Sequence, residues 1–270
     1  DVPDHDELVM SHAGRRLSYR KTGTGPAVLL LHGLGSGARD WEPQTLALAG
    51  RFTVIAPDLR GHGISSPASG AIDIAEQAAD MATLLMREGI DRADVVGMSM
   101  GGAIALQMAL DFPERVRSLT VVNSRSAFAP RSWRERLTYW QRLLIVRLLG
   151  LPRLGRILAG RLFPDQPGLQ AWFIERFGDN DRTSYLAALR GLAAWSVVHR
   201  LGEIRCPTLI VAADQDYTPL QDKRDDCARI PGARLAVIED ARHAVTVERP
   251  QAFNAVLLSF LDGETMEATA

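Results

Sequence analysis

A serine in a glycine-flanked turn is the residue of this chain best suited to chemistry. Ser99 stands in Gly97-Met98-Ser99-Met100-Gly101, after the strand-like run ADVV and before the helical run AIALQMAL. On such a strand-to-helix turn the serine hydroxyl is exposed, and the glycines leave room for the backbone to double back. The positive end of the helix dipole then faces the negative charge that develops during attack on a carbonyl. The segment predicts a nucleophilic serine, against the alternative of a serine that only caps a helix.

A serine nucleophile needs a general base, and six histidines are candidates. His243 follows the strand-like run LAVIE and a short loop late in the chain. This position fits the chain order of serine, acid and histidine that goes with such a serine turn. His5 and His12 lie in the N-terminal stretch, and His199 follows no sheet strand. His62 stands in a Gly-His-Gly loop that could line the site. We therefore choose His243 as the base.

The acid that orients this histidine should follow the strand-like run PTLIVAA. Asp214 and Asp216 both do, in the segment Asp214-Gln215-Asp216-Tyr217-Thr218-Pro219. We choose Asp216 because it comes after the turn has begun, and Asp214 stays open as the alternative. The acid would hold His243 in the right tautomer and stabilise its imidazolium form.

Backbone amides are expected to stabilise the negative oxygen of a tetrahedral intermediate. One should be the amide of Met100, directly after the nucleophile. The other should be the amide of Leu34, in the His32-Gly33-Leu34-Gly35 loop that follows the run AVLLL. We expect the imidazole of His32 itself to have a structural role. The residues that we expect around a substrate pocket are His32, Gly33, Met98, Trp133, Trp140 and Tyr217.

Strand-like and helical segments alternate along most of the chain, which is typical of a mostly parallel sheet with helices on both faces. Continuous apolar runs such as AVLLLH and FTVIA are expected of strands that are buried on both sides. The expected strands are 17–19, 27–32, 52–56, 93–96, 119–122, 208–212 and 235–238, and the expected helices are 74–88, 101–110 and 252–261. The predicted fold class is α/β, with residues 1–124 and 201–270 as its core.

Residues 125–200 interrupt this alternation with helical patterns and no strand-like run, which predicts a helical cap over the sheet. The segment holds thirteen arginines and five acidic residues, in a chain whose net charge is −1. These arginines could attract an anionic carboxylate substrate, although a solvated helix surface is the simpler interpretation. One helix face carries the apolar residues Trp133, Leu137, Trp140, Leu144 and Leu148. We expect this face to pack on the sheet rather than to lie on a membrane.

The composition excludes several classes of protein. With 270 residues, of which 46% are hydrophobic and 23% charged, the chain is expected to be globular. A net charge of −1 favours neither nucleic acid nor a membrane surface as a partner. Cys206 and Cys227 form neither a disulfide framework nor a zinc motif. No run approaches the roughly 20 apolar residues of a membrane span, and the acidic start at Asp1 is unlike a signal peptide. We expect a cytoplasmic protein, with removal of a leader before Asp1 left open.

Five segments carry a resemblance to a known family. They are HGLGSGARDW (32–41), APDLRGHG (56–63), GMSMGG (97–102), PTLIVAADQDYTP (207–219) and EDARHAVTVERP (239–250). Together they resemble the α/β-hydrolase superfamily, and more narrowly its small esterase, enol-lactonase and ring-cleavage hydrolase branch. The resemblance implies hydrolysis through an acyl-enzyme, with no metal and no organic cofactor, and often a dimer. Haloalkane dehalogenases and epoxide hydrolases are also similar, but they carry Asp at the position of Ser99.

Two departures from the family pattern bear on the finer assignments. Ala213 stands where family members commonly have glycine, and the acid is shifted relative to Pro219, which concerns the choice of Asp216. Carbon–carbon hydrolases often carry Trp after the histidine, whereas Ala244 stands here. We predict a serine hydrolase that cleaves a carboxylic ester or lactone of a small molecule, with a homodimer as the candidate assembly. The alternatives are a carbon–carbon hydrolase of a ring-cleavage product, an acyltransferase and a ligand receptor without catalysis.

Overall fold

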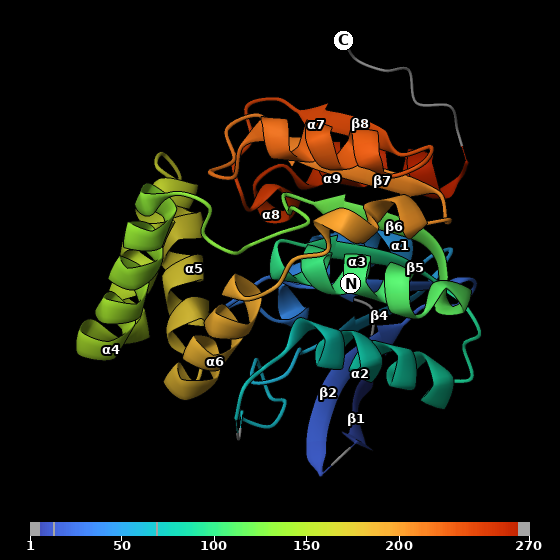
Figure 1. Ribbon diagram of the computed structural model, residues 1–270. Helices are drawn as coiled ribbons and strands as arrows, with labels where there is room; N and C mark the ends of the chain where they lie inside the picture. The colour runs from blue at the N-terminus through green and yellow to red at the C-terminus, as the bar shows by residue number, and fades with distance from the viewer. Residues whose placement is uncertain (1–5, 13, 69, 264–270) are drawn as a thin grey trace.

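One mixed sheet organises the chain. The computed structural model describes residues 6–12, 14–68 and 70–263. These residues form an eight-stranded sheet in the order β1-β2-β4-β3-β5-β6-β7-β8 (Figure 1). The strands are β1 (Asp6–His12), β2 (Arg15–Thr22), β3 (Ala27–Leu31), β4 (Thr53–Pro57), β5 (Ala93–Met98), β6 (Val116–Val122), β7 (Thr208–Ala213) and β8 (Arg234–Ile238). Only the β1–β2 and β2–β4 pairs are antiparallel. The predicted α/β class with a mostly parallel sheet is therefore confirmed.

Helices connect the parallel strands, as right-handed crossovers require. They are α1 (Glu42–Leu48), α2 (Ile74–Arg87), α3 (Met100–Asp111), α4 (Trp133–Leu162), α5 (Pro167–Gly178), α6 (Arg182–Ala193), α7 (Leu220–Arg229), α8 (Val245–Glu248) and α9 (Pro250–Leu261). Short 3-10 helices are found at η1 (Ala38–Trp41), η2 (Pro113–Arg115) and η3 (Val198–Glu203). None of the helices in the described ranges is long and apolar enough to cross a membrane.

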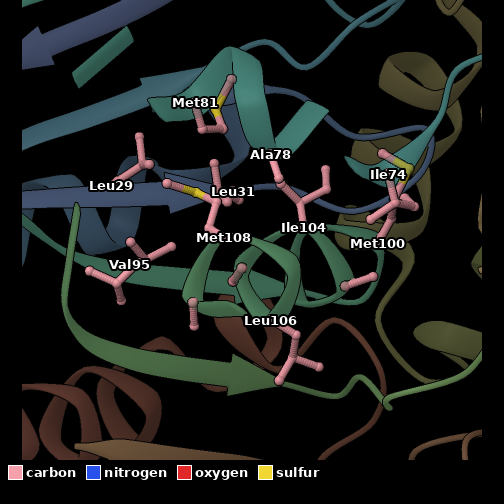
Figure 2. Packing of buried hydrophobic residues seen from close by; sticks show 14 of the residues in the cluster. Leu29, Leu31, Ile74, Ala78, Met81, Val95, Met100, Ile104, Leu106 and Met108 are labelled. Atoms are coloured by element: carbon pink, nitrogen blue, oxygen red, sulfur yellow. The ribbon is translucent and has the colours of Figure 1, made fainter. Parts of the chain in front are cut away.

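The sheet separates two apolar cores because side chains alternate between its faces. On one face, Leu29 and Leu31 of β3 pack with residues of α2 and α3, including Ile104 and Met108 (Figure 2). On the other face, Val28 and Leu30 join a cluster of side chains from the neighbouring strands, which also contains Trp41, Phe253, Leu257 and Phe260. All five side chains of β3 are buried, which explains why its sequence is continuously apolar rather than alternating.

The helices α4, α5 and α6 stand to one side of the sheet (Figure 1). They share a small core of their own, in which Leu143, Val146, Phe177 and Tyr185 are buried. Gly150 interrupts α4 with a φ of 77°, and Pro152 follows it, so the element consists of two helices joined at a kink.

The prediction that the apolar face of residues 133–148 packs on the sheet is wrong. Trp133, Leu137, Trp140, Leu144 and Leu148 are all exposed. The helix instead buries a second apolar side, with Leu143 and Val146, against α5 and α6. A helix with apolar residues on two sides can bury only one of them against a single neighbour layer.

Candidate active site

Ser99 occupies a strained turn between β5 and α3. Its backbone dihedral angles, φ of 53° and ψ of −116°, lie in a region that residues other than glycine rarely adopt. A Cβ atom at Gly97 would overlap the carbonyl of Gly101, and one at Gly101 would overlap the carbonyl of Leu31. Both glycines are therefore required by close backbone approach, as the sequence predicts. The turn is held by the amide of Ser99, which donates to Val122 O at 2.9 Å.

His243 and Asp216 meet at the carboxyl end of the sheet, in loops that follow β8 and β7. His243 Nδ1 lies 2.7 Å from Asp216 Oδ1. The other candidate acid, Asp214, accepts the amide of Ala241 at 3.1 Å and so ties the two loops together. Asn123 adds a second tie, because its side chain donates to His243 O at 2.8 Å. Of the two aspartates that the sequence left open, Asp216 is the one that touches the histidine.

The carboxylate of Asp216 has a second partner, a lysine, that sequence reasoning missed. Lys223 of α7 is fully buried, and its Nζ lies 2.6 Å from Asp216 Oδ2. Thr218 Oγ1 also donates to this oxygen. Burial alone would raise the pKa of Asp216, but His243 and Lys223 outweigh burial and hold the pKa well below its ordinary value. Asp216 is therefore ionised at neutral pH, and its Oδ1 accepts the proton on Nδ1.

Tyr217 covers the outer nitrogen of His243. Its hydroxyl lies 3.0 Å from Nε2, and the two rings are 4.2 Å apart between centroids. Tyr217 is 61% exposed as a residue, but its hydroxyl is turned inward to His243. Desolvation of the hydroxyl there raises the pKa of Tyr217 to about 12, whereas Arg142 and a hydrogen bond with Ser99 oppose the rise. The hydroxyl is therefore protonated and donates to Nε2, which is free to accept because Nδ1 faces the carboxylate. Among the described side chains, Tyr217 and not Ser99 is the hydrogen-bond partner found for Nε2.

The two amides predicted to bind the oxyanion border the serine. Gly33 lies against Ser99, since a Cβ there would be 3.4 Å from Ser99 Cβ, and Leu34 follows it. Met100 is the first residue of α3. In the turns and loops that the structure describes, neither Leu34 nor Met100 donates its amide to a backbone carbonyl. The predicted role in binding an oxyanion requires amides without such an acceptor.

The loop that carries Leu34 is fixed by two buried histidines. His32 Nδ1 lies 2.8 Å from Gly33 O, and its Nε2 accepts the amide of Leu59 at 2.9 Å. His62 Nε2 accepts the amide of Gly35 at 3.0 Å. Burial and the neighbouring His32 lower the pKa of His62 to about 3, so it is a neutral acceptor. Both imidazoles are used in backbone contacts, as we expect for His32 from the sequence.

The remaining pocket candidates fall into two groups. Met98 ends β5 next to Ser99, and its sulfur lies 3.5 Å from Thr246 Oγ1. Trp133 and Trp140 are exposed on α4, where the contacts found for them are with Arg134 and Tyr139 of the same helix. The structure therefore brings Met98 and Tyr217 to the serine but not these two tryptophans, because the stretch of α4 that bears them faces outward.

Arg142, on the inner side of α4, is a site residue that the sequence did not single out. Interactions with Tyr185 of α6 and Tyr217 raise its pKa. In the described part of the chain no carboxylate forms an ion pair with it. A periodicity count could have placed Arg142 opposite the exposed stripe, but not beside Tyr217. Within the same residues, no group of three or more His, Cys, Asp or Glu side chains is arranged to hold a metal ion.

Comparison with known proteins places the chain in a family. The sequence model of the α/β-hydrolase fold family matches residues 26–250. A protein of Azorhizobium caulinodans, provisionally named carbamate hydrolase RutD, is 34% identical over 260 residues, which cover 90% of this chain and 94% of that protein. The 3-oxoadipate enol-lactonase 2 of Acinetobacter baylyi is 31% identical over 235 residues, 85% of this chain and 86% of the enzyme.

A solved structure agrees with these sequence relatives. The enol-lactonase of Burkholderia xenovorans superposes with a TM-score of 0.86 at 26% identity, over 94% of this chain and 100% of that chain. The nucleophile turn, the parallel sheet and the carboxyl-end loops described above are the features shared by such a fold. The chain belongs to the α/β-hydrolase family, in the branch that contains esterases and enol-lactonases, and hydrolysis is the activity that this membership supports.

Proposed function

We propose that the protein is a serine hydrolase that cleaves a carboxylic ester or lactone of a small molecule through an acyl-enzyme. Ser99 is the nucleophile, His243 the base and Asp216 the acid of this proposal. The observation that carries it is the 2.7 Å contact between Asp216 Oδ1 and His243 Nδ1, in loops beside the strained turn of Ser99. Relatives named as enol-lactonases support a lactone among the candidate substrates.

The reaction follows from the positions of these groups. Ser99 Oγ attacks the carbonyl carbon while His243 Nε2 takes its proton. The amides of Leu34 and Met100 stabilise the oxyanion, and His243 then protonates the leaving alcohol oxygen. Water, deprotonated by His243, attacks the acyl-enzyme and releases the acid and free Ser99. For a lactone the alcohol and the acid leave as one opened molecule.

The hydroxyl of Tyr217 must move away from His243 before this cycle can start, because it lies 3.0 Å from Nε2, the nitrogen that has to accept the proton of Ser99. Rotation of its side chain would expose Nε2 to Ser99. The residue is 61% exposed, so rotation leaves the apolar cores packed while it breaks the contacts of the hydroxyl with His243, Arg142 and Ser99. We propose that an arriving substrate takes the place of the Tyr217 hydroxyl, which makes this contact a feature of the ligand-free enzyme.

We also propose that residues 125–200 act as a cap that completes the substrate pocket. Arg142 of α4 and Tyr185 of α6 reach Tyr217 from this segment. Phe177 of α5 lies against Gly35, close to the expected oxyanion loop. The cap thus contributes side chains on the open side of Ser99, while the sheet contributes the serine, the histidine and the acid.

The proposal is tested with p-nitrophenyl esters of short acids and with a series of small lactones. Ser99→Ala is expected to lower turnover to background. In mass spectrometry, the acyl-enzyme of a slowly hydrolysed ester should appear as an added acyl mass on the native chain but not on the variant. Ser11→Ala, at an exposed position of β1, is the matched control and should keep full activity. Undiminished hydrolysis by Ser99→Ala would contradict the nucleophile assignment.

A further inference from the structure

The outer side of α4 carries a row of exposed apolar side chains, which we call the outer stripe. It consists of Trp133, Leu137, Trp140, Leu144 and Leu148, whose exposed fractions lie between 49% and 71%. Their spacing places them on one face over four turns of helix. Single exposed apolar residues are ordinary, but a continuous row of five large ones marks an interaction surface.

The outer stripe is not needed to hold the cap together. The opposite side of α4 buries Leu143 and Val146 in the small core shared with α5 and α6. In Figure 1, α4 lies at the left edge of the molecule, with α5 between it and the sheet. The stripe therefore faces away from the rest of the described chain, and no other described element covers it.

Positive charge flanks the outer stripe on both sides. At about 100° per residue, Arg136 and Arg147 project to one side of the stripe and Arg134 to the other. All three are exposed, and within the described residues no ion pair is found for any of them. The guanidinium of Arg134 lies 5.4 Å from the ring centre of Trp133, so the cation borders the apolar row directly.

Acidic residues that could neutralise this face are scarce. The helix holds seven arginines and one acid, Glu135. Glu135 is already paired with Arg125 at 3.3 Å, and Arg131 also approaches it, at 3.9 Å. The second half of α4 adds Arg153, Arg156 and Arg161, which are exposed as well. Both helices of α4 therefore carry an excess of positive charge.

We propose that α4 docks the protein on the surface of an anionic lipid bilayer, with the outer stripe in the headgroup region. Tryptophan and leucine on one side, with arginines that can reach the phosphates, are the composition of helices that lie in a membrane interface. The proposal concerns association and does not depend on the reaction at Ser99.

A second copy of the chain fits this face less well. In a two-fold interface the same patch meets itself, so the arginine-bordered face of one copy would meet the arginine-bordered face of the other. Like charges held together across an interface oppose association. An anionic bilayer offers negative charge to the arginines and an apolar interior to the outer stripe. The net charge of −1 does not counter this, because α4 by itself carries seven arginines against one acid.

The test measures binding of the full chain to vesicles by co-sedimentation. Phosphatidylcholine vesicles with 30 mol% phosphatidylserine, at about 0.05 M salt, are compared with pure phosphatidylcholine and with about 0.5 M salt, where exposed charges are screened. We expect binding to the anionic vesicles at low salt, a fall at high salt, and a blue shift of tryptophan fluorescence that W133S/W140S abolishes.

Two pairs of variants separate the apolar and the charged contributions. R136Q/R147Q is expected to weaken partitioning about 25-fold, because each cation near an anionic surface contributes roughly a factor of five. R87Q/R224Q removes two exposed arginines from α2 and α7 and should bind like the native chain. M86S, at an exposed position of α2, is the control for W133S/W140S. Thermal unfolding and circular dichroism establish that each variant is folded.

Three results would overturn the proposal. Native protein that stays in the supernatant with anionic vesicles at low salt excludes lipid docking. Equal binding by the native chain and by both α4 variants would assign docking to another face. A dimer in sedimentation equilibrium that W133S/W140S dissociates, without vesicle binding, would make a second copy the occupant of the outer stripe.

Discussion

The buried contact between Lys223 and Asp216 supports a prediction that joins stability to the proposed chemistry. Both side chains are inaccessible to solvent, and Nζ lies 2.6 Å from Asp216 Oδ2 and 2.6 Å from Thr218 O. In Lys223→Met the methylene stem is kept and the cation is lost. Asp216 is then a buried carboxylate with His243 as its remaining charge partner.

The magnitude follows from this burial. Removing one partner of a buried ion pair costs about 3–5 kcal/mol, because the remaining charge stays without its counter-charge. At about 2–4 °C per kcal/mol for a chain of this size, the midpoint of thermal unfolding should fall by about 6–20 °C. The pKa of Asp216 is expected to rise, since Lys223 is one of the two groups that lower it.

The sign of the pH dependence is fixed by the lowered pKa of Asp216. Its ionised form stabilises the native chain above the unfolded pKa of about 3.9, and this stabilisation is lost as pH falls toward the folded pKa. In Lys223→Met the carboxylate takes up its proton at a higher pH. Both the loss of stability in acid and the acid limb of the rate profile should therefore begin at a higher pH than in the native chain.

The assay is thermal unfolding from pH 3 to 8, with kcat/KM measured over the range in which the protein is folded. Lys21→Met is the matched control, because Lys21 forms a half-exposed pair with Glu88 at 2.6 Å and such pairs contribute about 0–1 kcal/mol. The double variant D216N/K223M removes both charges and should be more stable than the sum of the single losses implies. If it is no more stable than that sum, or if Lys223→Met unfolds like Lys21→Met, the ion-pair reasoning is wrong.

Three further outcomes follow from the same site. Tyr217→Phe removes the hydroxyl on His243 Nε2 and should speed labelling of the serine by a fluorophosphonate by about two- to tenfold, the equivalent of one net hydrogen bond; slower labelling would show that the hydroxyl assists attack. Asp216→Asn should lower kcat by about 10⁴ through the wrong tautomer, whereas Asp214→Asn should keep kcat within a few-fold, and equal losses would reopen the choice between them. Gly101→Ala forces a Cβ onto a backbone carbonyl and should cost about 3 kcal/mol or more in chemical denaturation, which an unchanged midpoint would refute.

The sequence was sufficient where a structure depends on neighbours along the chain. The buried strands β3 and β5 and the helix α3 were predicted within a few residues of their observed ends, because continuous apolar runs and helical spacing are local signals. The turn of Ser99 was also predicted from a local motif, although only Gly97 has its close backbone contact inside the strand-to-helix unit, whereas Gly101 packs against Leu31 of β3. Chain order then selected His243 without any knowledge of distances.

Other features of the site and of the fold could be read only from the tertiary structure, because they depend on which elements pack against each other. Lys223 stands in the charged helix LQDKRDDCAR, and only the packing of α7 beside the loop after β7 turns it into a buried partner of Asp216. The choice between Asp214 and Asp216 depended on where two loops come together. The helix α4 has apolar residues on two sides, so its periodicity could not say which side the cap would bury. Whether a residue is buried depends on what packs against it, and the residues that pack against these are distant in sequence.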